Sequence, residues 1–263
     1  MEVQFIRNAT IKITYGGKVW LIDPFFADPH TLPPFAGKSR NPLVPLPATI
    51  EEIMDGVDHI LITHLHPDHF DKKAQSNIHR STPFLVPPSD AGTIQKMGFD
   101  QVVQIEGEVD LERVRVTRVP AQHGEGKILS VMGKVSGYIL ECDEEPTIYI
   151  TGDTVWCKPV RETLNKFLPS VIICNTGGNS FFPDSHPFGE HIELKHPHKV
   201  IMDSEQVYLL MAHAKEARLV AAHIGALDHE TVSREELREF LNKKGVAPER
   251  FFIPMEGERI AFN

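Results

Sequence analysis

The sequence predicts an α/β protein of four layers, in which two sheets pack against each other and helices cover their outer faces. Short strand-like runs follow one another in hairpins at the start of the chain, and later runs alternate with helical segments. This order of elements is typical of helices packed on sheets. The length of 263 residues fits one large α/β domain, so we expect residues 1–263 to form a single domain.

The opening segments predict an antiparallel sheet. Three β-rich runs occupy residues 3–6, 10–14 and 18–23. The Gly16-Gly17 pair between the last two runs favours a tight hairpin turn.

A stiff loop follows the first hairpins. Residues 28–47 contain six prolines, which is too many for a helix or a central strand. Thr49 and Glu52 then carry the signature of a capping box, which predicts a helix through Met54. The apolar run over 59–63 predicts a buried strand.

The rest of the chain alternates between the two kinds of element. We expect strands over residues 83–87, 102–105, 113–119, 129–141, 147–150, 170–174 and 219–223. We expect helices near residues 68–78, from about residue 89, and over 204–217 and 233–244. Ser233 and Glu236 form a second capping box, and Gly245 suits the end of that last helix.

The stretch THLHPDHF, residues 63–70, places three histidines and an aspartate within six positions: His64, His66, Asp68 and His69. Clustered imidazoles repel one another when they are charged, so a cluster of this kind needs a compensating partner. A divalent metal ion is such a partner, because imidazole nitrogen and carboxylate oxygen are common zinc ligands. A histidine-rich surface turn without metal is the alternative.

The spacing within the cluster favours two neighbouring ions. In extended backbone His64 and His66 point to the same side and can share one ion. Pro67 suits a first helical turn, so we expect Asp68 and His69 to project from the start of the next helix toward a second point.

Three further candidates follow predicted strands elsewhere in the chain. They are His123 in PAQHG, Asp153 in ITGDT and His223 in AAHIG. A single polar residue at a strand end is more often part of a turn. Together with the HxHxDH cluster, the three form a consistent set of metal ligands.

These motifs, together with Asp23 in LIDP, resemble in order those of the metallo-β-lactamase superfamily of metal-dependent hydrolases. The resemblance spans residues 23–223 and implies an αββα sandwich of two mixed sheets, with the active site along one edge. LIDPFF, TGDT and NTGG, with a short strand after the last helix, look most like the L-ascorbate 6-phosphate lactonase branch.

The resemblance also implies a ligand set. One ion would take His64, His66 and His123. The other would take Asp68, His69 and His223, with Asp153 bridging the two ions. For Asp23 the resemblance implies that it orients ligands through hydrogen bonds, and a strand-end turn at Pro24 is the alternative.

A hydrolytic mechanism follows from such a centre. Water shared by two divalent ions loses a proton near neutral pH, because even one zinc lowers its pKa to about 7. We expect this metal-bridging hydroxide to be the nucleophile, with Asp68 as the catalytic residue that orients the water or carries its proton. The net positive centre favours a small ester, lactone or phosphodiester substrate, which we expect to be anionic.

Other functions stay open at this point. The same superfamily hosts nucleases, but these usually have a basic surface, and the formal net charge here is -9. A diiron oxygen or nitric oxide reductase would need a flavin-bearing partner domain. A metal-binding or ligand-sensing module without catalysis is the non-enzymatic alternative. GxSxG and P-loop motifs are absent, which excludes two common enzyme classes.

Composition bounds the partners and the cellular location. No apolar run approaches the roughly 20 residues of a membrane span, and the N-terminus lacks a signal-peptide pattern, so we expect a cytoplasmic protein without membrane contact. We expect no nucleic-acid partner and a small-molecule substrate. The ligand types suit zinc or manganese, with iron possible, and the branch resemblance suggests a homo-oligomer.

Several weaker candidates remain. The segment 186–198 contains His186, His191, His196 and His198, which we interpret as loop histidines, with a substrate-facing lid as the alternative. TGGN at 176–179 is interpreted as a turn, and Asp203 as a helix N-cap. The residues that could line the pocket are Trp156, Cys157, His229 and Glu256.

Overall fold

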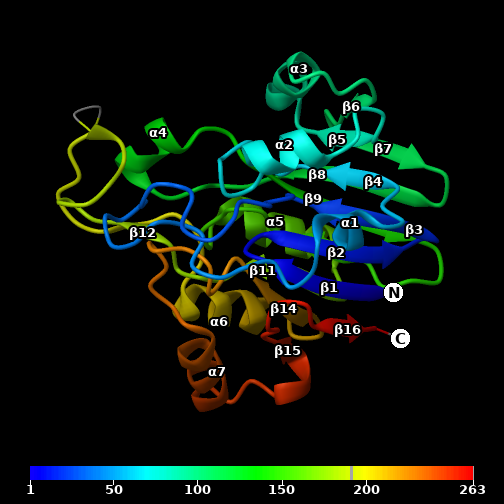
Figure 1. Ribbon diagram of the computed structural model, residues 1–263. Helices are drawn as coiled ribbons and strands as arrows, with labels where there is room; N and C mark the ends of the chain where they lie inside the picture. The colour runs from blue at the N-terminus through cyan, green and yellow to red at the C-terminus, as the bar shows by residue number, and fades with distance from the viewer. Residues whose placement is uncertain (190–191, 263) are drawn as a thin grey trace.

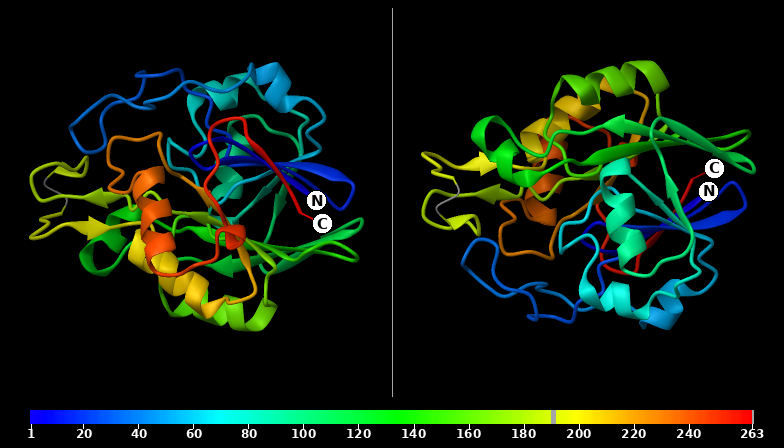
Figure 2. Two further views of the ribbon diagram at one scale, coloured as in Figure 1. Left: turned by 90° about the horizontal axis from the view of Figure 1, so that it is seen from below. Right: turned by 90° about the horizontal axis from the view of Figure 1, so that it is seen from above.

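In the computed structural model, which describes residues 1–189 and 192–262, two sheets pack between two layers of helices (Figure 1). The views from below and above in Figure 2 show helices on both outer sides of the paired sheets. The predicted four-layer α/β arrangement is therefore confirmed.

The first sheet has seven strands and is mixed. In spatial order its strands are β16 (Arg259–Ala261), β1 (Glu2–Arg7), β2 (Thr10–Tyr15), β3 (Lys18–Ile22), β4 (His59–Leu61), β5 (Phe84–Val86) and β6 (Val102–Gln104). Pairing is antiparallel from β16 to β3 and parallel from β3 to β6. The expected hairpin at Gly16-Gly17 joins β2 to β3, and both glycines have positive φ, which glycine adopts without steric cost.

The second sheet has the same plan. In spatial order its strands are β15 (Phe251–Phe252), β14 (Arg218–Ala222), β11 (Val171–Asn175), β10 (Ile148–Ile150), β9 (Ser136–Cys142), β8 (Val114–Pro120) and β7 (Glu108–Leu111). Pairing is antiparallel from β7 to β10 and parallel from β10 to β15. A small third sheet pairs β12 (Ser180–Phe181) with β13 (His198–Lys199).

Alternating side chains of the central strands belong to different layers of the core. In β11, Val171 and Ile173 pack between the two sheets, whereas Ile172 and Cys174 pack under the outer helices. Successive strand residues point to opposite faces, so a strand buried on both sides is apolar throughout. This explains why the run SVIIC carries no polar residue after its serine.

Two groups of helices form the outer layers. The helices α1 (Ile50–Met54), α2 (Lys72–Asn77) and α3 (Pro88–Lys96) cover the first sheet. The helices α5 (Lys158–Phe167), α6 (Ser204–His213) and α7 (Arg234–Lys243) cover the second sheet. Three short helical elements also occur: η1 (Gly126–Ile128), α4 (Leu129–Met132) and η3 (Pro248–Arg250). Figure 1 shows α4 and β12 at the end of the molecule opposite the termini.

Local capping agrees with the sequence at three helices. Both predicted capping boxes are present, at Thr49 and at Ser233, and Asp203 accepts a hydrogen bond from the Gln206 amide as the N-cap of α6. None of the helices in the described part of the chain is long and apolar enough to span a bilayer.

The structure corrects two local predictions and adds one helix that we did not predict. Residues 129–132 form the helix α4, because the short apolar run LSVM packs Met132 into a small cluster, and the strand begins only at Ser136. Periodicity alone does not separate a strand from a helix in so short a run. The helix expected from residue 68 begins only at Lys72, because the Asp71 side chain caps it. The helix α5, which has Pro159 in its first turn, was not predicted.

Candidate metal centre

The seven candidate ligands meet at one edge of the paired sheets, just after the C-terminal ends of four strands. The cluster 64–69 follows β4, and His123, Asp153 and His223 follow β8, β10 and β14. The predicted convergence of these side chains is therefore observed. Asp68 and His69 reach it from a turn before α2 and not, as we expected, from the helix itself.

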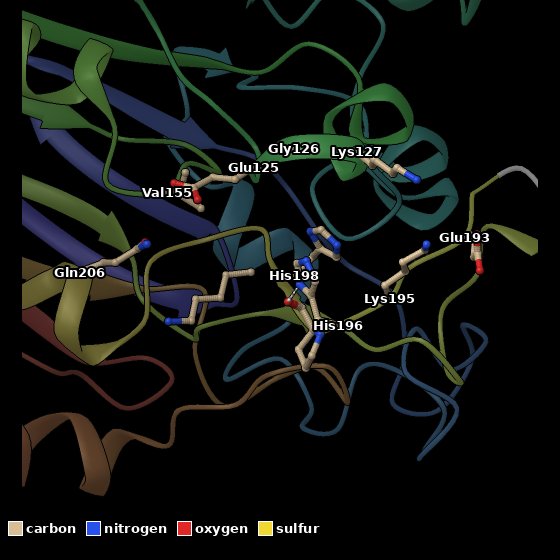
Figure 3. Close-up of a pocket in the computed structure, with 11 residues that line it drawn as sticks. Glu125, Gly126, Lys127, Val155, Glu193, Lys195, His196, His198 and Gln206 are labelled. Atoms are coloured by element: carbon tan, nitrogen blue, oxygen red, sulfur yellow. Dashed lines mark hydrogen bonds between the residues drawn. The ribbon is translucent and has the colours of Figure 1, made fainter.

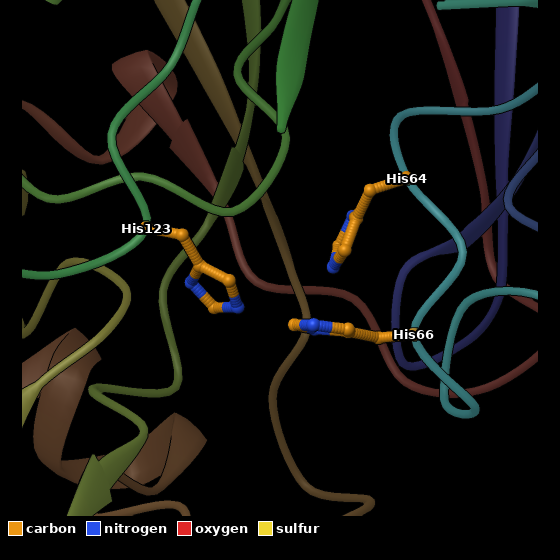
Figure 4. Close-up of side chains that lie close together, drawn as sticks. All are labelled: His64, His66 and His123. Atoms are coloured by element: carbon orange, nitrogen blue, oxygen red, sulfur yellow. The ribbon is translucent and has the colours of Figure 1, made fainter. Parts of the chain in front are cut away.

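Three overlapping groups of ligand atoms define the geometry. They are His64, His66 and His123; His64, His69 and Asp153; and Asp68, His69 and His223. Within each group the ligand atoms all lie within 4.8 Å of one another. Figure 4 shows the first group, whose rings come from two different segments and face one another.

Asp153 occupies the middle of the constellation. Its Oδ2 atom lies 3.3 Å from the Nε2 atoms of both His69 and His123. The same atom is 3.9 Å from the Nε2 atoms of His64 and His223. A carboxylate oxygen in this position can bridge two cations.

Three of the imidazoles present an unpaired nitrogen to this centre. The Nε2 atoms of His64, His69 and His123 are buried and have no hydrogen-bond partner. A buried polar atom without a partner is costly and needs an explanation, and a metal ion supplies one. The donor set therefore fits divalent metal ions.

The other nitrogen of each of these rings is held in place. The Nδ1 atom of His64 lies 3.0 Å from Thr63 Oγ1, and that of His123 lies 2.8 Å from the Val200 carbonyl oxygen. The Nδ1 atom of His69 lies 2.8 Å from Asp23 Oδ2. Such contacts fix the proton on Nδ1 and direct the Nε2 lone pair toward a metal.

Asp23 orients two parts of the ligand cluster. Besides His69, its carboxylate accepts hydrogen bonds from the Thr63 hydroxyl at 2.6 Å and from the Thr63 amide at 2.8 Å. Its backbone adopts a φ of 43°, and that of His223 a φ of 50°, which are both rare for residues other than glycine. These hydrogen bonds support the interpretation that Asp23 orients the ligands, over the alternative that it only caps a turn.

The carboxylates in the centre favour a positive charge between them. Burial opposes protonation of His69, but the carboxylates of Asp153, Asp23 and Asp68 outweigh it and hold the pKa of the ring well above its usual range. Burial lowers the pKa of His123 to about 4. Against the effect of burial, two of the same carboxylates also raise the pKa of His223, so they favour positive charge on the rings between them, in the place that a metal ion would take.

Asparagines that we did not predict support the carboxylates. Asn175 Nδ2 donates to Asp153 Oδ1 at 2.6 Å, and Asn8 Nδ2 donates to the Asp68 backbone carbonyl at 2.9 Å. Asn179, in the predicted TGGN turn, lies against His223. Their signal in the sequence is weak, because asparagine is common in any turn.

A cavity of about 300 Å³ opens beside the centre. Four candidate ligands form one wall: His66, Asp68, His123 and Asp153. Apolar side chains form most of the rest: Pro33, Pro34, Phe35, Pro67, Met132, Phe181, Pro187 and Phe188. The remaining lining residue is His229, one of the pocket candidates from the sequence.

Asp228 latches the proline-rich loop, residues 28–47, part of which lines this cavity. The Asp228 carboxylate accepts hydrogen bonds from the backbone amides of Phe35, Ala36, Lys38 and Ser39 and from the Asn41 side chain, at 2.9 to 3.3 Å. Nothing in the local sequence indicates this role, because the partners lie nearly 190 residues away.

Residues of the histidine-rich segment 186–198 line two separate cavities. Pro187 and Phe188 line the cavity beside the centre, whereas none of the segment's described histidines does. His196 and His198 stack on each other and line a separate cleft of about 640 Å³, together with Lys127 and Lys195 (Figure 3). His191 lies outside the described residues.

The other pocket candidates lie elsewhere. Glu256 forms an ion pair with Arg234, and Trp156 packs against His213 and Arg161. Cys157 is buried in the core beneath the second sheet. None of these three lines the cavity beside the centre, as far as the described residues define its walls.

Comparison with known proteins agrees with this geometry. The family model of the Beta-lactamase superfamily domain matches residues 19–224. The UPF0173 protein YddR of Bacillus subtilis is 33% identical over 268 residues, covering 100% of both chains.

Two solved structures are similar over the whole chain. A possible metal-dependent hydrolase from Veillonella parvula has a TM-score of 0.90 and 29% identity, covering 100% of this chain and 99% of the other. An isothiocyanate hydrolase from Delia radicum gut bacteria has a TM-score of 0.89 and 31% identity, with the same coverage.

The fold and the site thus define a member of the metallo-β-lactamase superfamily, and within it the chain belongs to the UPF0173 family of metal-dependent hydrolases. The superfamily inferred from the sequence is confirmed. The narrower resemblance to the L-ascorbate 6-phosphate lactonase branch finds no support in these relatives.

Proposed function

We propose that this protein is a dinuclear metal-dependent hydrolase that cleaves a small, uncharged and largely apolar substrate at an ester, lactone or similar electrophilic carbon. The observation that carries the proposal is the set of three buried, unpaired Nε2 atoms around Asp153 Oδ2. Zinc and manganese are the favoured metals, with iron possible.

The proposed ligand roles follow the positions of the side chains. His64, His66 and His123 would hold one ion, and Asp68, His69 and His223 the other. When bound, two ions would lower the pKa of a shared water and polarise the oxygen of a carbonyl group.

The chain itself would position the reactants. Asp68 Oδ2 lies 3.1 Å from His223 Nε2, and Asp68 also lines the cavity, so its carboxylate can reach both the centre and a bound substrate. We propose that Asp68 orients the attacking water and accepts its proton. The prolines and phenylalanines of the other walls would exclude bulk water and thereby strengthen these interactions.

The cavity walls argue for an uncharged substrate over the anionic one expected from the sequence. Among the described residues that line the cavity there is no lysine or arginine, whereas phosphate recognition commonly uses such side chains. We therefore favour an ester or lactone over a phosphodiester. The isothiocyanate hydrolase similar to this chain adds a third candidate, a neutral carbon bonded to nitrogen and sulfur.

A reconstitution experiment tests this proposal. Protein stripped with a chelator would be reloaded with zinc or manganese and assayed on aryl esters, lactones, aryl isothiocyanates and bis(p-nitrophenyl) phosphate. We expect metal-dependent turnover of an uncharged substrate, lost in His64→Ala and retained in the control His79→Ala, whose ring is exposed. Turnover that survives metal removal, or that is confined to the phosphodiester, would contradict the proposal.

A further inference from the structure

His229 is a buried polar group in the cavity for which the proposed mechanism has no role. Its side chain is only 5% exposed and lies between two aromatic rings. It stacks on Phe181 with ring centroids 5.2 Å apart, and Phe35 meets it edge-on at 5.3 Å. Apart from the candidate ligands, it is the one polar side chain among the described residues that line the cavity.

One nitrogen of the His229 ring is paired and the other is free. The Nε2 atom lies 3.0 Å from the side-chain amide of Asn179. The Nδ1 atom is buried without any hydrogen-bond partner. The ring itself lines the cavity beside four candidate ligands, so a molecule bound there packs against it, and an unpaired ring nitrogen is suited to bind a donor on that molecule.

Asn179 connects this ring to a candidate metal ligand. The same amide group lies 3.4 Å from Nδ1 of His223. The other polar atom of this side chain, Oδ1, is buried without a partner. The oxygen and nitrogen of an asparagine amide are assigned from the hydrogen-bond network, so the neighbouring rings decide which atom faces them.

A metal ion on His223 determines that orientation. His223 directs Nε2 toward Asp68 and the centre, so with metal bound at Nε2 the proton resides on Nδ1. That proton needs an acceptor, as it has in His69 and His123. The group in reach is the Asn179 amide, so its oxygen must face both rings.

We infer that in the metal-loaded protein Asn179 turns its carboxamide oxygen toward His223 and His229, so that His229 presents a bare Nδ1 to the cavity and binds an N–H or O–H group of the substrate. The part of this inference that concerns the substrate rests on the proposed function. The part that concerns the tautomer of His229 does not. It adds to the substrate class a hydrogen-bond donor next to the scissile group.

The tautomer can be measured directly. We would record long-range ¹H–¹⁵N correlation spectra of the imidazole rings in the zinc-loaded protein, with His229 assigned by its absence from His229→Gln. We expect the proton of His229 on Nε2, and we expect the same in Asn179→Asp, because a carboxylate can only accept. A proton on Nδ1 of His229 in the zinc-loaded wild type would overturn the inference.

The substrate contact is tested by a pair of variants and a pair of substrates. An asparagine at position 229 places an amide near the position of Nδ1, whereas a glutamine places it near Nε2. For an α-hydroxy lactone and its methyl ether, we expect wild type and His229→Asn to prefer the hydroxyl form by about tenfold in kcat/KM. We expect His229→Gln to lose that preference.

The possible failures are distinguishable. If no uncharged substrate is turned over by the loaded wild type, the proposed function fails, while the spectra still decide the tautomer. If the wild type turns over both lactones without preference, or if His229→Gln keeps the preference, the contact between His229 and substrate is refuted and the proposed function stands.

Discussion

Replacing Asp23 with asparagine should weaken metal binding although Asp23 is not itself a candidate ligand. Its Oδ2 atom accepts from His69 Nδ1 and from the Thr63 hydroxyl, and its Oδ1 atom accepts from the Thr63 amide. All three partners are donors. An asparagine amide has one acceptor and one donor end, so in either orientation an N–H group would face another donor.

The magnitude follows from this mismatch. A buried donor left unpaired costs about 1–3 kcal/mol. If the amide oxygen of the asparagine faces His69, a donor of Thr63 is left without an acceptor. If the oxygen faces away from His69, the proton of the His69 ring is no longer fixed on Nδ1. We therefore expect Asp23→Asn to weaken zinc binding about tenfold to a hundredfold, the range seen when such supporting groups are removed.

Competition with a chromophoric chelator measures this effect. Metal-free wild type and Asp23→Asn would be titrated with zinc in the presence of the chelator. Asp28→Asn is the matched control, because Asp28 is exposed and its carboxylate forms a surface ion pair with Lys73. Equal zinc affinity in Asp23→Asn and the wild type would refute the reasoning that Asp23 orients the ligands.

Three further predictions concern the centre and the loop above it. Asp68→Asn should lower kcat at least about a hundredfold in metal-reconstituted protein, and full turnover with both metals retained would exclude a catalytic role for this carboxylate. Because carboxylates outweigh burial and raise the pKa of His69 and His223, metal binding must displace protons, so apparent zinc affinity should rise between about pH 6 and 8; a flat titration profile would oppose this. Asp228→Ala should destabilise the fold by about 1–3 kcal/mol, raise KM more than kcat and speed hydrogen exchange at residues 35–39, whereas unchanged exchange would show that the latch is dispensable.

The positions of the ligands could be predicted because they depend on local pattern. Asp153 and His223 each follow a short apolar strand, and His123 follows the alternating strand β8. Strands that run in the same direction bring their C-terminal ends to one edge of a sheet. The cluster 64–69 is a strong motif by itself. The resemblance to a superfamily then supplied the grouping of the ligands, which strand ends alone do not determine.

What could not be predicted depends on distant parts of the chain. Asp228 latches a loop nearly 190 residues before it, and no local feature distinguishes it from any other turn aspartate. The apolar walls of the cavity come from separate loops, so the absence of lysine and arginine among its described lining residues was not visible in the sequence. The expectation of an anionic substrate came from the charge of the ions alone.

An anomalous-difference map from a crystal of the zinc-loaded protein would test the central claim most directly. The account predicts two peaks on either side of the Asp153 carboxylate. One would lie among His64, His66 and His123, and the other among Asp68, His69 and His223. A single peak, or peaks away from these side chains, would contradict it.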